Sequence, residues 1–174
     1  MLKKFYPDGH VHSVLQIDYM KLFKNGYRGI LFDIDNTLVH HGDDSTEEID
    51  DLFRKIHQIG LKTIIISNNN EERIKRFIKN IHTQYIAEAG KPDASGYLKA
   101  VEMLGLPKDE CVCVGDQIFT DIYGANKSNI DSILVDFIRL PEEKWFGKRR
   151  ILEKIILKFW TICRMGKTGM KYFY

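Results

Sequence analysis

A short apolar run that ends in two aspartates constrains the fold of this chain more than any other stretch. Residues 29 to 38 read Gly-Ile-Leu-Phe-Asp-Ile-Asp-Asn-Thr-Leu. Because Gly29 and a polar cluster bound too few apolar residues for a helix, the run predicts a buried strand with Asp33 and Asp35 at its carboxyl end. Side chains alternate along a strand, so we expect both carboxylates to point the same way and share one small site. At about 4 Å and an effective dielectric near 20, two like charges repel by about 4 kcal/mol, which calls for a cation or a proton between them.

The same pattern, an apolar run followed by a polar cluster, recurs along the chain. Further strands are predicted at residues 61 to 67, 85 to 88, 111 to 114 and 132 to 135, with helical patterns between them. This alternation predicts right-handed βαβ units, and therefore a three-layer, Rossmann-like α/β fold with a parallel sheet and helices on both faces. Ligands of such sheets bind beyond the carboxyl ends of the strands. The residues that fall there are Asp33, Ser67, Lys91 and Asp116.

Three segments are predicted along the 174 residues, which suit one domain of ordinary size. Residues 1 to 28 show one weak helical pattern, at 18 to 24, and are interpreted as an extension that packs on the core. Residues 29 to 143 form the catalytic core. Residues 144 to 174 form a basic, amphipathic carboxyl-terminal segment.

Composition limits the class of protein. With 44% hydrophobic and 29% charged residues, the chain is typical of a soluble globular protein. Its start lacks the apolar core of a signal peptide, and no run reaches the length of a membrane-spanning helix, so we expect a cytoplasmic protein. Three cysteines form neither a disulfide framework nor a C-x-x-C motif, which indicates buried free thiols.

The polar residues at the strand ends suit phosphoryl transfer, which depends on positioning and on neutralising charge. Ser67 and Asn68 precede a predicted helix, whose amino terminus favours a phosphate. Carboxylate oxygens favour Mg²⁺ as the ion. A carboxylate nucleophile that forms an aspartyl-phosphate divides one hard hydrolysis into two easier steps, and a neighbouring acid can protonate the leaving oxygen and then activate water. Asp33 and Asp35 fit those two roles.

These motifs resemble a known family. Asp33-Ile-Asp35-Asn-Thr37, Ser67-Asn68, Lys91-Pro92 and Gly115-Asp116-x-x-x-x-Asp121 are similar, in order and spacing, to the four motifs of the haloacid dehalogenase-like (HAD) phosphatases, over residues 29 to 137. More narrowly, Asp-Ile-Asp-Asn-Thr-Leu-Val, Ser-Asn-Asn and Gly-Asp-Gln-Ile-Phe-Thr-Asp look like the YqeG branch of subclass IIIA, which is related to phosphatidylglycerophosphate phosphatases.

The resemblance implies a role for each matching residue. Asp33 would be the nucleophile, Asp35 the general acid and base, and Ser67 a phosphate ligand. Lys91 would neutralise Asp33 and the phosphoryl group. Mg²⁺ would be held by Asp33, the backbone carbonyl of Asp35 and Asp116, with Asp121 and Thr37 supporting these ligands. The acid at Asp35 argues for a phosphatase, since the dehalogenases of the superfamily lack one there.

The spacing of the motifs leaves no room for a cap domain, because one helix and a loop or strand fill each of the two places where larger family members carry one. An uncapped site favours a macromolecular or surface-held phosphate monoester. Three functions stay open: a phosphatase for a lipid phosphate such as phosphatidylglycerophosphate, a phosphatase for nucleic-acid ends or phosphoproteins, and a phosphoacceptor or scaffold without catalysis. The motifs do not indicate an oligomeric state.

Net charge is only +2, but residues 144 to 174 carry nine Lys and Arg against one acid, Glu153. An apolar stripe at helical spacing runs through them: Ile151, Leu152, Ile155, Ile156, Phe159, Trp160 and Cys163. Basic flanks around such a stripe are typical of an interfacial helix, which would place the protein at the inner face of an anionic membrane. Nucleic acid is the other anionic partner considered. Alternatively, the stripe covers one face of the sheet.

Overall fold

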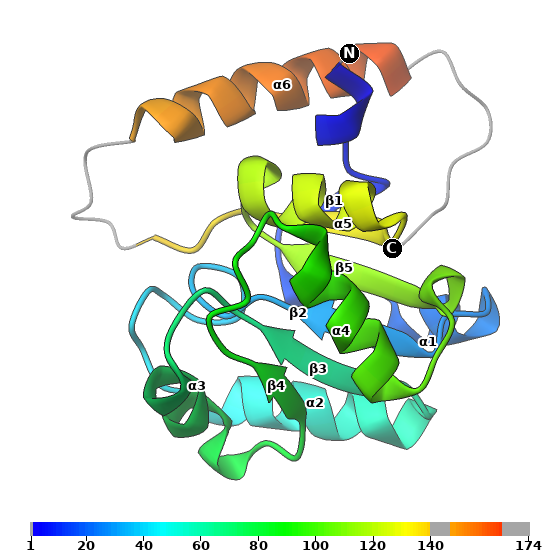
Figure 1. The fold of residues 1–174 in the computed structure, drawn as a ribbon, viewed down its shortest axis with the longest axis vertical. Helices are drawn as coiled ribbons and strands as arrows, with labels where there is room; N and C mark the ends of the chain where they lie inside the picture. The colour runs from blue at the N-terminus through cyan, green and yellow to red at the C-terminus, as the bar shows by residue number, and fades with distance from the viewer. Residues whose placement is uncertain (1, 140–146, 165–174) are drawn as a thin grey trace.

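A sheet of six parallel strands forms the centre of the molecule (Figure 1). The structure is a computed structural model, and it describes residues 2–139 and 147–164. The strands are β1 (Gly9–Val11), β2 (Gly29–Phe32), β3 (Lys62–Ile66), β4 (Gln84–Ile86), β5 (Cys111–Gly115) and β6 (Asp131–Val135). Their order is β1-β6-β5-β2-β3-β4, so β2 lies between β5 and β3. The predicted α/β fold is confirmed.

Helices cover both faces of the sheet, as the alternating sequence pattern predicts. On one face lie α1 (Tyr19–Lys24), α2 (Glu47–Ile59) and α3 (Glu71–Phe77), and on the other lie α4 (Ala94–Leu104) and α5 (Tyr123–Ser128). Successive strand residues serve opposite faces: Phe32 belongs to the cluster under α2, whereas Leu31 belongs to the cluster under α4. Burial on both faces explains why β2 is apolar throughout.

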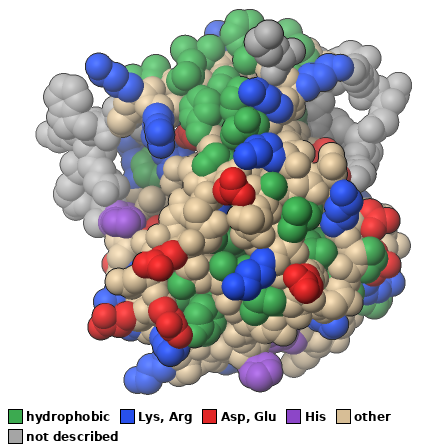
Figure 2. All heavy atoms as spheres, viewed as in Figure 1, with side chains coloured by type: hydrophobic (Ala, Val, Ile, Leu, Met, Phe, Trp, Pro, Cys, Tyr) green, Lys and Arg blue, Asp and Glu red, His purple; other side chains and the backbone are tan. Residues whose placement is uncertain are grey.

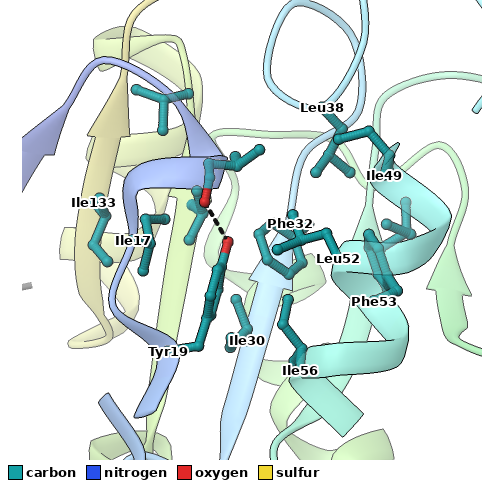
Figure 3. Close-up of a cluster of buried hydrophobic side chains, with 14 of the residues drawn as sticks. Ile17, Tyr19, Ile30, Phe32, Leu38, Ile49, Leu52, Phe53, Ile56 and Ile133 are labelled. Atoms are coloured by element: carbon teal, nitrogen blue, oxygen red, sulfur yellow. Dashed lines mark hydrogen bonds between the residues drawn. The ribbon is translucent and has the colours of Figure 1, made fainter. Parts of the chain in front are cut away.

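The larger core lies between the sheet and α2 (Figure 3). Phe53 of α2 lies against Phe32 of β2, with ring centroids 5.3 Å apart. The buried Tyr19 donates its hydroxyl hydrogen to the backbone oxygen of Val14 at 2.8 Å, so the amino-terminal segment is tied into the same core. This apolar layer packs against β2, the strand that ends directly before Asp33.

The sequence missed one strand. Residues 1 to 28 predict only a weak helix, and that helix forms as α1, but β1 also adds an edge strand to the sheet through parallel pairing with β6. Three residues that include His10 carry too little apolar pattern to be recognised alone. Their pairing with β6 is what makes them a strand.

Helix α6 (Lys148–Arg164) lies across the β6 side of the molecule, beside the amino-terminal 3₁₀ turn Leu2–Phe5 (Figure 1). Its inner face is small: Ile156 is buried, and the indole nitrogen of Trp160 donates to the backbone oxygen of Pro7 at 2.8 Å. The outer face of α6 consists of five apolar side chains that are each about half exposed: Ile151, Leu152, Ile155, Phe159 and Ile162.

The prediction that the stripe covers one face of the sheet is therefore wrong for most of its residues, because only Ile156 is buried. Among the described residues, no helix has the length and apolar character needed to cross a bilayer. The basic and aromatic residues from 165 to 174, which entered the prediction of membrane attachment, lie outside the described part of the chain.

No cap domain is inserted at either place where one was considered. Between β2 and β3 the chain forms a loop and α2, and between β3 and β4 it forms α3 and the short turn Ile78–Asn80. All of these residues are described. The carboxyl edge of the sheet is therefore covered by short loops, and on the β6 side by α6.

Candidate active site

The four residues predicted to meet at the carboxyl edge of the sheet do lie there. Asp33 directly follows β2, Ser67 follows β3, Lys91 follows the loop after β4, and Asp116 follows β5. All four side chains are buried, and so is Asp121. Charged groups this deeply buried need partners, because an unpaired buried charge loses its hydration without compensation.

Lys91 joins two of the carboxylates. Its ammonium nitrogen Nζ lies 2.5 Å from Asp33 Oδ1 and 2.7 Å from Asp121 Oδ1. Burial by itself would lower the pKa of Lys91, but the attraction of Asp121 and Asp33 exceeds that effect and raises it. Lys91 therefore keeps its charge and faces Asp33, as predicted for a charge partner of the nucleophile.

Asp116 is held from two sides. The hydroxyl of Thr37 donates to Asp33 Oδ2 at 3.1 Å and lies 3.3 Å from Asp116 Oδ1, so it connects the two carboxylates. On the other side, the guanidinium of Arg150 from α6 bonds Asp116 Oδ2 and also donates to the backbone oxygen of Asp116 at 2.7 Å. We call Asp33, Asp116, Asp121, Lys91 and Arg150 the charge cluster.

The charge cluster has three carboxylates and two cations, so one negative charge lacks compensation. Burial is the main reason that the pKa of Asp33 is raised to about 6 and that of Asp116 to about 7, and repulsion from Asp121 adds to both shifts. One oxygen from each of Asp33, Asp116 and Asp121 lies within 4.8 Å of the others. A buried group of carboxylate oxygens with excess negative charge fits Mg²⁺, which prefers oxygen ligands.

A comparison with protein-family models shows the family of the chain. The model of the haloacid dehalogenase-like hydrolases matches residues 40–129. The chain belongs to the haloacid dehalogenase-like hydrolases. This membership confirms the predicted family, and it sets aside the interpretation of the chain as a scaffold without catalysis.

Relatives narrow the branch within the HAD hydrolases. The chain is 38% identical over 137 residues to the probable phosphatase YqeG of Bacillus subtilis (strain 168), which covers 78% of this chain and 80% of YqeG. It is 25% identical over 167 residues to phosphatidylglycerophosphate phosphatase 1 of Arabidopsis thaliana, covering 88% of this chain and 47% of that protein. These similarities confirm the predicted YqeG-like branch and the predicted phosphatase enzyme.

A solved structure supports the fold alone. A protein from Listeria monocytogenes serotype 4b superposes with a TM-score of 0.56 at 20% identity, over 75% of this chain and 97% of that one.

Asp35, which the sequence predicts to share a site with Asp33, has partners other than the members of the charge cluster among the described residues. Strand β2 ends at Phe32, and the carboxylate of Asp35 accepts hydrogen bonds from Asn69 Nδ2 at 2.6 Å and Arg73 Nη2 at 2.9 Å. The backbone N–H of Gly42 donates to it at 3.0 Å. Burial would raise the pKa of Asp35, but these three donors together lower it. Strand β2 ends before Asp33, so strand alternation does not set the direction of Asp35, and its shared site with Asp33 stays a prediction.

The two predicted phosphate ligands, Ser67 and Asn68, make hydrogen bonds within the protein. Ser67 Oγ accepts from the backbone N–H of Asn69 at 3.2 Å, which holds the loop after β3 in place. Asn68 uses both ends of its amide on the backbone of Lys91, accepting from its N–H at 2.7 Å and donating to its carbonyl at 3.1 Å. Asn68 thereby positions Lys91. Its role as a substrate ligand stays a prediction, as does that of Ser67.

Sequence reasoning missed three residues that bind predicted site residues in this HAD hydrolase: Asn69, Arg73 and Arg150. Arg73 was detectable as a cation in the first turn of the helix that follows the Ser67 motif. Arg150 carried no local signal, because it lies in a basic stretch that begins far from Asp116 in the sequence. Only the docking of α6 brings it to the site.

Proposed function

We propose that the protein is a Mg²⁺-dependent phosphatase that hydrolyses a lipid phosphate monoester, such as phosphatidylglycerophosphate, through an aspartyl-phosphate. The observation that carries the lipid assignment is the outer face of α6. Its five half-exposed apolar side chains lie on the same helix as Arg150, which binds Asp116. A site attached in this way to an exposed apolar helix suits a substrate that is anchored in a lipid surface.

The residues divide the reaction into two steps. Asp33 attacks phosphorus and forms the aspartyl-phosphate, while the ester oxygen leaves with a proton from Asp35. In the second step Asp35 takes a proton from water, the hydroxide attacks phosphorus, and inorganic phosphate and free Asp33 are formed. Lys91 holds Asp33 Oδ1 and neutralises charge on the phosphoryl group.

Asp35 must be protonated to begin this sequence. A phosphate dianion beside it raises its pKa by like-charge repulsion, which opposes the effect of Asn69 and Arg73. Mg²⁺, when bound by Asp33, Asp116 and the backbone carbonyl of Asp35, would neutralise charge on the transferring group.

A cleft beside the site has the character that a lipid headgroup requires. It has a volume of about 370 Å³ and lies between the end of β6 and α6, where Asp116 and Arg150 contribute to its wall. Arg139 and Lys154 supply positive charge, and Asp136 and Glu153 supply negative charge. The apolar part of the wall consists of Ile118, Leu134, Val135, Phe137 and Leu157. A phosphate ester with an apolar body matches both kinds of lining.

Positive charge surrounds the outer face of α6. Lys148, Arg149, Lys154 and Lys158 are exposed on the same helix. Figure 2 shows Lys and Arg side chains among hydrophobic ones over the upper part of the molecule, the end at which α6 lies in Figure 1. Each Lys or Arg near an anionic bilayer contributes about 1 kcal/mol of attraction. An anionic lipid surface at this end is therefore the partner we propose.

A substrate panel tests the proposal. Phosphate release is measured from phosphatidylglycerophosphate in anionic vesicles, 3′-phosphoryl DNA, phosphopeptides and sugar phosphates, at equal phosphate concentration. We expect the vesicle-bound lipid to give the highest kcat/KM. A higher value for DNA or phosphopeptides would replace the lipid assignment with the second predicted phosphatase function. A sugar phosphate as best substrate would contradict the argument from the missing cap.

A further inference from the structure

Arg150 is the only residue of α6, among the described residues, for which the structure records bonds to the aspartates of the charge cluster. Its guanidinium binds Asp116 twice, once through the carboxylate and once through the backbone oxygen. Two anchors from neighbouring nitrogens of one planar group fix both the position and the rotation of the aspartate. A residue with that geometry determines which carboxylate oxygen stays available to a ligand.

Arg150 is itself held in place. Its Nη1 donates to Glu153 Oε2 at 3.1 Å, and Glu153 Oε1 in turn accepts from the backbone N–H of Phe119 at 3.3 Å. The guanidinium lies over the ring of Phe137, 4.7 Å from its centroid. Glu153 is buried, so this arrangement replaces water around the arginine. The result is a fixed chain of contacts from Phe119 through Glu153 and Arg150 to Asp116.

The bonds divide the two oxygens of Asp116 between two tasks. Oδ2 is engaged by Arg150, whereas Oδ1 lies on the side of Thr37, whose hydroxyl also bonds Asp33. The oxygen that faces Asp33 is the one left for a cation. Groups that hold a metal-binding carboxylate from behind set its orientation, and their loss typically weakens metal affinity by about 10- to 100-fold.

We propose that Arg150 is a positioning residue that orients Asp116 for a divalent cation, so that α6 is a working part of the active site. This inference rests on the magnesium site of the proposed function but not on the identity of the substrate. A guanidinium near a cation also repels it, and orientation of Asp116 must outweigh this repulsion. The sign of the change in metal affinity therefore decides the proposal.

The test is direct Mg²⁺ binding by calorimetry, without substrate. We expect Arg150→Ala to raise the dissociation constant about 10- to 100-fold, Arg150→Lys to restore part of the affinity, and Glu153→Gln to raise the constant by a smaller factor. Arg149→Ala is the matched control, since Arg149 is the exposed neighbour on the same helix and should leave the constant unchanged within about twofold. Each variant is checked by thermal unfolding.

The outcomes separate the two proposals. Unchanged or tighter Mg²⁺ binding by a folded Arg150→Ala would overturn the positioning role, and tighter binding would show that repulsion dominates. If Arg150→Ala does not fold, Glu153→Gln decides, and an unchanged constant overturns the proposal. No Mg²⁺ binding by the parent protein would refute the metal site of the proposed function together with this inference. If the substrate panel shows that a soluble phosphate ester is the best substrate, the positioning role of Arg150 is not affected.

Discussion

The charge cluster and the outer face of α6 both reverse the usual distribution of residues. The charge cluster places four buried charged side chains and the partly buried Arg150 inside the protein, and the outer face of α6 leaves five apolar side chains about half exposed. Each member of the charge cluster binds another member, and Arg150 also binds Glu153. Within residues 2–139 and 147–164, the outer face of α6 lies outside the small cluster around Ile156.

The difference between the two regions indicates two kinds of missing component. The charge cluster has an excess carboxylate, so a cation or a phosphate-bound metal would complete its electrostatics. The outer face of α6 has unburied apolar area, so a lipid surface would complete its packing. Arg150 connects them, since it belongs to the helix of one region and binds the aspartate of the other. Substitutions and metal removal can therefore test the two regions separately.

The largest effect should come from Asp33→Asn, which removes the proposed nucleophile. We expect phosphate release to fall by more than about 10³-fold, with no covalent phosphate adduct detectable by mass spectrometry. Asp51→Asn, a change of an exposed carboxylate on α2, is the control and should leave turnover unchanged. Turnover close to the parent value in Asp33→Asn would show that the charge cluster does not contain the nucleophile.

Removal of divalent cations should have the next largest effect. The three carboxylates and a phosphate ester repel one another strongly in a buried site, so we expect EDTA to abolish activity and Mg²⁺ to restore it. Activity is measured before and after chelation and again with added Mg²⁺ or Zn²⁺. Full activity after exhaustive chelation, or restoration by Zn²⁺ in preference to Mg²⁺, would contradict the oxygen-ligand site.

Polar substitutions on the outer face of α6 should act only at a lipid surface. We expect the double change Ile155→Asp with Phe159→Asp to lower hydrolysis of vesicle-bound substrate about tenfold, because apolar burial is lost and anionic lipid is repelled. Hydrolysis of a soluble aryl phosphate should stay the same.

Leu98→Asp is the matched control for that experiment, because Leu98 is a similarly exposed apolar residue on α4, away from α6. It should leave both activities unchanged. An equal loss on the soluble and the vesicle-bound substrate would mean that α6 matters for folding or catalysis but does not bind lipid. Vesicle co-sedimentation of the same variants would show whether the loss of activity comes from weaker membrane binding or from slower catalysis.

The smallest effect concerns the stability of the metal-free protein. Asp33 has its pKa raised to about 6 in the folded state, above the usual value, so its contribution to stability is present below about pH 4 and is lost as pH rises through 6. Asp33→Asn removes this loss. The free energy of unfolding of Asp33→Asn, relative to that of the parent protein, should therefore grow by about 2 kcal/mol between pH 4.5 and pH 8.

Chemical denaturation in EDTA measures that difference at each pH. Repulsion from Asp33 helps to raise the pKa of Asp116 to about 7, so the loss of stability from Asp116 is smaller in the variant and changes the comparison in the same direction. A relative stability that stays constant with pH, or that falls as pH rises, would contradict the uncompensated charge of the charge cluster.

Much of the fold and the site followed from local sequence. Strand β2 buries both of its faces and is therefore apolar throughout, which marks it as a strand of a parallel sheet. The carboxyl ends of such strands share one edge, so the sequence by itself groups Asp33, Lys91 and Asp116 at that edge. Short-range pattern and one rule of topology were sufficient for these predictions.

Other features were decided only by the tertiary structure. Strand β1 needs β6 beside it, because three residues with little apolar pattern acquire their conformation from backbone pairing. Asp35 is bound by Asn69 from the loop before α3 and by Arg73 from α3, and only the packing of α3 beside the end of β2 supplies these donors. Arg150 reaches Asp116 from 34 residues away, and the stripe of α6 stays exposed because only a narrow inner face meets the core. Periodicity in the sequence shows which side chains share one face of a helix or strand. The partner that this face meets depends on contacts between segments far apart in the sequence, and a local pattern carries no information about those contacts.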